Sequence, residues 1–380
     1  MLKENRLAVI IAVSMVSAIG GLVFNTMPLL LNAVSEALGL TKAQLGTLSL
    51  CAGFGYLAGT LTAPLWVERV NWRRASFVIV ALAVMSFLLA GQVGPALLPV
   101  VFTSFAFFCA LAIALAMRVL ADMPEPEQAF GARLTVELVS IGVFLGILPV
   151  YFIAKAGFSG AMWGLAGFAL LLGLGSLLMP ERSTNAQAQA QKGFPSWGAA
   201  KRSYLHLGIF LIYLLANVGL FFFLAVIAQD FQPSPEQFGV MFSVLKWLGG
   251  FAGFVGAVIG ARLGLRLPHM LAFGLLVLGV IGLFVAKDFT TFMVASWVWE
   301  FGFTLGCLYQ TTAISRHDIS GKLVVLVPAA FGVSMLLGGK IAGQLLSGGS
   351  ATSLYGFVAV CSLLPVLYVL SAKMQKEVST

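Results

Sequence analysis

The chain has 380 residues, of which 60% are hydrophobic and only 9% are charged, and its mean hydropathy is +1.00. So few polar side chains cannot cover the surface of a water-soluble protein of 40.2 kDa. The formal net charge of +8 suggests a nucleic-acid partner only where a water-exposed domain carries a basic patch, and the sequence offers no such domain. The composition therefore indicates an integral membrane protein.

Apolar segments of about 20 residues, long enough to cross a bilayer as helices, follow one another between short polar or Gly/Pro breaks. Their expected limits are 7–31, 44–66, 75–91, 96–117, 129–153, 158–178, 204–229, 238–260, 268–286, 291–312, 323–347 and 353–372. The first is too long for the apolar core of a cleaved signal, so we expect it to be retained. Twelve spans place both chain ends on one side of the membrane.

The lysines and arginines predict the orientation of these spans. With the N-terminus in the cytoplasm, the outer loops hold only Lys42, Lys155 and Lys287. The inner tails and loops hold Lys3, Arg6, Arg69, Arg73, Arg74, Arg118, Arg133, Arg182, Lys192, Lys201, Arg202, Arg262, Arg266, Arg316, Lys322, Lys373 and Lys376. This bias follows the positive-inside rule and predicts a multi-pass protein of the cytoplasmic (inner) membrane with both termini in the cytoplasm.

A polar, Ala-Gln-rich stretch divides the chain into two halves that repeat one another. We expect a six-helix bundle over 1–180, a cytoplasmic linker over 181–203 and a second six-helix bundle over 204–380. Thr41 to Gly46 opens the second span and Ser234 to Gly239 opens the eighth, 193 residues later, each with the pattern of a capping box. The same offset relates the basic residues of the following loops, which indicates a duplicated unit.

With these features the sequence resembles the major facilitator superfamily over essentially its whole length. The loop after the second span carries the family's Gly-rich helix end and charged signature, here Gly55 to Gly59 and then ERVNWRR at 68–74, with Glu for the usual Asp and Asn for a usual Gly. The resemblance implies an all-α membrane fold of twelve helices in two pseudo-symmetric six-helix bundles. It also implies secondary transport by alternating access, with Glu68, Arg69 and Arg73 in a cytoplasmic latch. A plain positively charged inner loop is the alternative for these residues.

Three ionisable residues lie inside spans of the second half: Lys246, Glu300 and Lys340. Counting from the outer helix ends places all three roughly 10 to 14 Å below the outer surface. We expect Glu300 to pair first with Lys340, so that the remaining positive charge is balanced by an anionic substrate. Two basic residues in spans eight and eleven resemble the arrangement of oxalate-formate antiporters, and a carboxylate and lysine on spans ten and eleven resemble the proton-coupling pair of lactose permease. The alternative is a purely structural Lys–Glu pair.

Further candidates are distributed over both halves. Arg118, Arg133 and Glu137 form an expected inner cluster for gating or proton coupling, in which Arg133 and Glu137 share a helix face. Possible substrate ligands are Asn25, Tyr213, Asn217, Tyr309, Gln310 and Gln344. A lone amide in a helix bundle more often makes an interhelical hydrogen bond, and that alternative stays open for each of them.

The sequence thus predicts a transporter, not an enzyme, that moves a small carboxylate-type organic anion by proton-coupled symport or by exchange. We expect no cofactor or metal, no nucleic-acid partner, and a monomer in the lipid bilayer. A proton-coupled multidrug or sugar exporter of the same superfamily is the first alternative. A non-transporting sensor or lipid-handling protein is disfavoured because the chain lacks an extramembrane domain and the His-Glu-x-x-His and Gly-x-Ser-x-Gly motifs.

Overall fold

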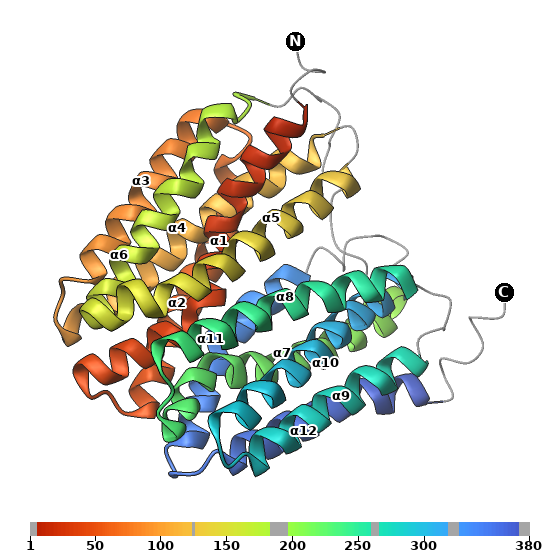
Figure 1. The fold of residues 1–380 in the computed structure, drawn as a ribbon. Helices are drawn as coiled ribbons and strands as arrows, with labels where there is room; N and C mark the ends of the chain where they lie inside the picture. The colour runs from red at the N-terminus through yellow and green to blue at the C-terminus, as the bar shows by residue number, and fades with distance from the viewer. Residues whose placement is uncertain (1–5, 124–125, 183–196, 260–265, 318–326, 372–380) are drawn as a thin grey trace. The chain divides into compact units, whose positions relative to one another are not determined.

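The computed structural model describes residues 6–123, 126–182, 197–259, 266–317 and 327–371, and within these ranges the chain is helical and contains no β-strand (Figure 1). Six helices form the first half: α1 (Arg6–Leu38), α2 (Lys42–Trp66), α3 (Trp72–Ala90), α4 (Leu98–Ala121), α5 (Pro126–Ile147) and α6 (Ala154–Gly173). Six more form the second: α7 (Trp197–Ala228), α8 (Pro235–Ile259), α9 (Arg266–Val285), α10 (Phe289–His317), α11 (Val327–Leu346) and α12 (Thr352–Leu370). Lys3, Lys192, Arg262, Lys322, Lys373 and Lys376 of the expected inner loops lie outside the described residues.

Among the described residues, eleven helical segments are long and apolar enough to cross a membrane. One of them, Ala132–Leu178, has 47 residues. A single helix of that length would extend about 70 Å, more than twice the hydrocarbon thickness. The backbone leaves the helical conformation at Ala156 and at Gly157, where φ is +55°. A short π-helical stretch, Leu148–Ile153, precedes this break and packs against α6. The segment therefore holds two helices, α5 and α6, and the twelve expected spans are all found.

Two boundaries differ from the expected ones by seven residues, and the others by less. Helix α1 continues seven residues beyond 31 because the amide of Asn32 donates to the Glu36 carboxylate one turn later, so both polar side chains are accommodated on the helix. It ends at Leu38, and Gly39 follows with a φ of +62°, which suits glycine, and an N–H that bonds back to the Ser35 carbonyl. Helix α7 begins at Trp197, so the last seven residues of the expected linker are helical.

Local side-chain caps start several helices. At α2 the Thr41 hydroxyl accepts from the Gln44 N–H at 3.3 Å while the Gln44 side chain accepts from the Thr41 N–H at 2.8 Å, which confirms the expected capping box. Helix α8 begins at Pro235, the expected first position. Before α10, Asp288 accepts hydrogen bonds from the backbone N–H and the hydroxyl of Thr291, which hold the pKa of this loop carboxylate below its usual range.

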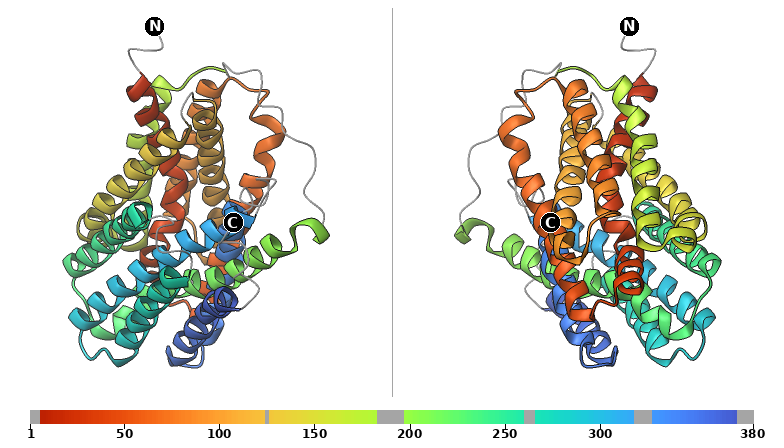
Figure 2. Two further views of the ribbon diagram at one scale, coloured as in Figure 1. Left: turned by 90° about the vertical axis from the view of Figure 1, so that its right-hand side faces the viewer. Right: turned by 90° about the vertical axis from the view of Figure 1, so that its left-hand side faces the viewer.

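The chain divides into two compact units: Met1–Gln191 with Pro235–Ser243, and Lys192–Ser234 with Val244–Thr380. In unit 1, α4 lies at the centre, because α1, α2 and α3 all pack along it. In unit 2, α7 packs along α10, α11 and α12. The helices of each unit are long rods (Figure 2). Close approach depends on glycine: a Cβ on Gly55 of α2 would lie 2.0 Å from the Thr103 carbonyl oxygen of α4.

Candidate functional site

A buried ion pair joins two helices of unit 2. Lys246 Nζ of α8 lies 3.2 Å from Glu300 Oε1 of α10, and the two side chains are only 6% and 5% exposed. The Phe221 ring of α7 lies under the ammonium, 4.0 Å from Nζ to the ring centroid. Such charges are costly in a low-dielectric interior unless they are paired, and here the carboxylate and the aromatic face both compensate the lysine.

Only one oxygen of the Glu300 carboxylate has a hydrogen-bond partner among the described residues. Oε1 meets Lys246, whereas Oε2 is buried and has no hydrogen-bond partner among the described residues. Gly249 lets α8 approach this carboxylate, because an added Cβ would lie 3.0 Å from Glu300 Oε1 and 3.3 Å from Thr304 Oγ1. A buried acceptor without a donor is unfavourable. The site is therefore suited to take up a proton or a donor group of a ligand at Oε2.

The expected pairing of Glu300 with Lys340 is wrong, since the lysine partner of the carboxylate is Lys246. Helix α11 is fixed to α7 through Gly338, at which a Cβ would lie 2.6 Å from the Leu215 carbonyl oxygen. Lys340 follows two residues later, about 200° around the helix axis, and therefore does not share the face that contacts α7. The side chain is partly exposed. Lys340 and the ion pair nevertheless belong to the same unit.

A hydrogen-bond network next to the ion pair uses two of the expected substrate ligands. Asn217 of α7 is fully buried; its amide donates to the Tyr213 carbonyl at 2.9 Å and to the Ser362 hydroxyl of α12 at 3.0 Å. The Trp299 indole of α10 donates to Asn217 Oδ1 at 3.0 Å. The Tyr213 hydroxyl donates to the Phe303 carbonyl at 2.9 Å. These contacts fix α10, and with it Glu300, against α7, which is the interhelical alternative expected for a lone amide.

The remaining candidates of unit 2 lie in different surroundings. Tyr309 is buried in an apolar cluster with residues of α9, α10 and α12, such as Ala272 and Val369. Gln310 is buried, and its Oε1 has no hydrogen-bond partner in the described part of the chain. Gln344, one turn after Lys340, is exposed. Only Gln310 therefore resembles Glu300 in offering a buried acceptor.

Unit 1 has a second buried ion pair, which confirms the expected contact of Arg133 with Glu137. Arg133 Nη2 lies 2.5 Å from Glu137 Oε2, and both side chains are 12% exposed. Arg133 Nε donates to the Ser17 hydroxyl of α1 at 2.6 Å. The carboxylate packs on Gly21, where a Cβ would lie 2.5 Å from Glu137 Oε1, and the Asn25 amide donates to the Gly21 carbonyl at 2.8 Å.

Ser17 was not among the expected site residues. It could have been found from the spacing of Ser17, Gly21 and Asn25, which repeats every four residues and gives α1 one small and polar face. Asn25 itself is buried, and its amide is used within its own helix.

Arg118, the third residue of the expected inner cluster, has carboxylate partners other than Glu137. Its guanidinium pairs with Glu68 at the end of α2, lies 3.4 Å from Asp122, and stacks over the Trp72 ring at 5.5 Å. Glu68 is thereby placed in the charged loop that the sequence indicated, with Arg118 as the partner that the sequence did not indicate.

The basic residues of the same loop have separate contacts. Arg73 lies 3.5 Å from Glu181 and donates to the Met179 carbonyl at 2.9 Å. Arg69 is exposed, and its backbone N–H bonds to the Trp66 carbonyl. Arg73 therefore ties the start of α3 to the chain that follows α6.

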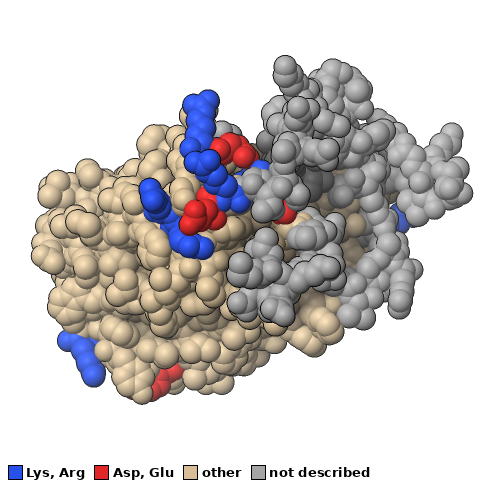
Figure 3. Space-filling model, turned by 90° about the horizontal axis from the view of Figure 1, so that it is seen from above, with Lys and Arg blue, Asp and Glu red and all other residues tan. Residues whose placement is uncertain are grey.

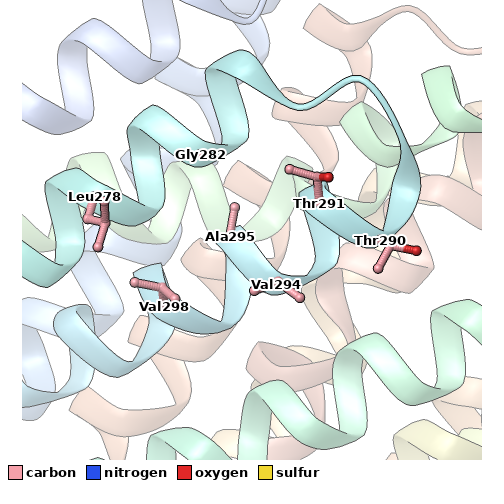
Figure 4. A pocket seen from close by; sticks show the side chains of 7 residues that line it. All are labelled: Leu278, Gly282, Thr290, Thr291, Val294, Ala295 and Val298. Carbon is pink, nitrogen blue, oxygen red and sulfur yellow. The ribbon is translucent and has the colours of Figure 1, made fainter.

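A hollow of about 390 Å³ lies between α9 and α10 of unit 2 (Figure 4). Its lining includes Leu278, Val294 and Val298, and none of its lining residues is charged. Leu278 and Val294 are largely exposed on helices that are apolar enough to cross a membrane. This hollow is therefore a lipid-facing surface feature and not a candidate for specific chemistry.

Comparison with known proteins agrees with this architecture. Residues 9–316 match the family model of the Major Facilitator Superfamily. No curated protein matches the sequence.

Three solved structures illustrate the similarity of fold. The nucleoside transporter NupG superposes with a TM-score of 0.75 at 12% identity, covering 97% of this chain and 99% of that chain. The xylose transporter XylE from E. coli gives a TM-score of 0.69 at 11% identity over 96% and 98% of the two chains. A bacterial homologue of the human lysosomal transporter Spinster, inward-facing and unoccupied, gives 0.67 at 13% identity over 97% and 95%. At these identities the likeness shows the fold alone.

Proposed function

This chain belongs to the Major Facilitator Superfamily and is a multi-pass membrane transporter, and we propose that it moves a small carboxylate-type organic anion across the cytoplasmic membrane. Transport would proceed by alternating access, in which two helical bundles rock about a central site. We propose that transport is coupled to a proton through Glu300. Exchange of one anion for another is the alternative mode of coupling. Both termini would lie in the cytoplasm, and the protein would act as a monomer.

The observation that carries this proposal is the buried pair of Lys246 and Glu300 in a unit that also contains Lys340. The two lysines and one carboxylate in the spans of this unit have a formal charge of +1. Apolar surroundings make an excess charge unfavourable, and a bound carboxylate would neutralise it.

The geometry also suggests how a proton and an anion would bind together. While Glu300 is ionised, it holds Lys246. When Glu300 takes up a proton, for which the unpartnered Oε2 offers a position, its negative charge disappears and Lys246 becomes available to an anionic ligand. Lys340 would make the second contact. A monovalent anion that binds together with the proton leaves the formal charge of the three residues at +1, whereas an anion that binds while Glu300 is ionised neutralises it.

A thermal-shift screen of the purified protein tests the substrate class. Carboxylates, sugars, nucleosides and lipophilic cations are compared at two pH values. We expect stabilisation by a carboxylate, and we expect that shift to be lost in both Lys246→Gln and Lys340→Gln. Lys287→Gln in an outer loop is the matched control and keeps the shift. Stabilisation by lipophilic cations alone, or an unchanged carboxylate shift in both variants, would overturn the anion assignment.

A neutral polyol, such as a sugar or a nucleoside, is the second candidate. Glu300 Oε2 and Gln310 Oε1 are buried acceptors without a hydrogen-bond donor among the described residues, and hydroxyl groups would supply the donors. The similar folds of a xylose and a nucleoside transporter are compatible with this alternative. In the same screen it predicts stabilisation by a sugar or nucleoside that depends on Glu300 and Gln310 and survives Lys340→Gln.

A further inference from the structure

A groove runs along unit 1, and neither residue of that unit's buried ion pair lines it. Helices α2 and α3 each pack along α4, whereas in the described residues they make few contacts with one another. The space between them has a volume of about 710 Å³, within the range of ligand pockets. Among the residues that line it are Trp66 of α2, Arg74, Val78 and Leu82 of α3, and Phe107 and Leu111 of α4. Helix α4 is thus the floor of the groove.

Most of the groove has the chemistry of the hydrocarbon core. Val78 and Leu82 are 57% and 37% exposed, and they lie on a helix that is apolar enough to cross the membrane. Lipid tails are as apolar as these side chains, so filling the groove with an acyl chain satisfies its shape but yields little hydrophobic gain. Any selectivity among lipids must therefore come from the polar end.

That polar end has a free positive charge. Arg74 is exposed in the first turn of α3, and its guanidinium makes no ion pair in the described part of the chain; its backbone N–H bonds to Asn71. Two nearby carboxylates are already engaged, Glu68 by Arg118 and Glu181 by Arg73. Figure 3 shows several basic and acidic side chains close together on the face seen there, with a few further charged side chains toward its edge. The local field at the groove therefore favours an anion.

Trp66 places this end of the groove at the depth of lipid headgroups. The apolar run of α2 continues through Trp66 and Val67 up to the charged Glu68, and α3 starts at Trp72, two residues before Arg74. Tryptophan is enriched at the membrane–water interface, and arginine at an inner interface attracts anionic lipids. The amphipathic order of the groove, charged at the interface and apolar toward the membrane centre, matches that of a phospholipid.

We propose that the groove between α2 and α3 binds an anionic phospholipid of the inner leaflet, with its headgroup at Arg74 and Trp66 and an acyl chain along Val78, Leu82 and Phe107. This site is separate from the proposed transport site and does not depend on the identity of the substrate. Zwitterionic lipids of the same chain length fit the apolar part but gain nothing from Arg74.

Native mass spectrometry of the purified full chain tests the proposal, with phosphatidylglycerol and phosphatidylcholine of identical acyl chains as probes. The first phosphatidylglycerol is expected to bind more tightly than the first phosphatidylcholine. Arg74→Gln should reduce this preference about fivefold, the factor that one arginine at an anionic lipid surface contributes. Val78→Trp, which fills the groove, should weaken the first binding of both lipids.

Matched controls separate the groove from general surface binding. Arg266→Gln removes an exposed arginine at the start of α9, and Leu89→Trp enlarges an exposed residue of α3 outside the groove. Both controls should bind lipid as the wild type does. Equal affinity of the wild type for the two lipids, an unchanged preference in Arg74→Gln, or an equal fall in Arg266→Gln would overturn the proposal.

Discussion

At the scale of single residues, the part of the chain that the structure describes has two buried ion pairs in its helices, one in each unit. In the pair of Lys246 and Glu300, the acceptor Oε2 has no hydrogen-bond donor among the described residues. In the other pair, Arg133 also donates to the Ser17 hydroxyl, and the Glu137 carboxylate packs on Gly21. The first pair can therefore take up a proton at Glu300 Oε2, where no donor from the described residues has to be displaced. The second has a tighter set of contacts, which indicates a stronger role in holding α1 to α5.

Arg133→Gln tests the structural role of the second pair. The change leaves the Glu137 carboxylate buried without its cation, which typically costs about 3–5 kcal/mol of folding stability. We expect a clear fall in the Tm of the purified protein. The double variant Arg133→Gln with Glu137→Gln removes both charges and should recover much of the loss. Equal Tm values for the single and double variants would contradict a buried, mutually dependent pair.

The site residues show how far sequence reasoning reaches at this scale. Counting along the helices identified Lys246, Glu300 and Lys340 as intramembrane charges, because such residues are rare in apolar spans. Counting gives depth but not the rotation of each helix about its axis. Apolar residues surround α10 on most sides, so periodicity does not indicate which neighbour Glu300 faces. The choice of Lys246 over Lys340 as the partner of Glu300, and the pairing of Arg118 with Glu68, required the structure.

At the scale of helices, glycine sets the closest approaches. Gly55 brings α2 against the α4 backbone, and Gly338 brings α11 against the α7 backbone. Close backbone packing of this kind is typical of membrane helices, where the apolar solvent supplies no hydrophobic force between them. The sequence predicted the helices themselves to within a few residues, because span length follows from bilayer thickness. The exceptions, α1 and α7, extend beyond the apolar core, where hydropathy carries no signal.

Gly55→Ala tests the α2–α4 contact. The added Cβ would lie 2.0 Å from the Thr103 carbonyl oxygen, so the two helices must separate. Overpacking of this type costs about 1–3 kcal/mol, and we expect a lower Tm. Gly167→Ala in α6 is the matched control, because nothing lies within 4 Å of its added Cβ. It should leave the Tm unchanged or raise it slightly. A similar effect of both changes would show that the α2–α4 approach does not depend on Gly55.

At the scale of the whole molecule, membership of the family shows that the protein is a transporter. It does not identify the substrate. The same fold serves nucleoside and xylose transporters at 11–12% identity, so the fold does not select a cargo. The sequence predicted the class because composition and span count determine it. The sequence could not determine the cargo, because recognition depends on which side chains together face one binding site.

The measurement that tests the central claim most directly is lumenal pH in proteoliposomes, recorded with an entrapped pH-sensitive dye while the stabilising carboxylate is added outside. We predict that the anion acidifies the lumen in the wild type and in the control Lys155→Gln. In Glu300→Gln we predict no acidification, although counterflow of labelled anion continues, because Lys246 and Lys340 remain able to bind it. Acidification that persists in Glu300→Gln, or uptake of a neutral sugar or nucleoside in place of any carboxylate, would contradict the account.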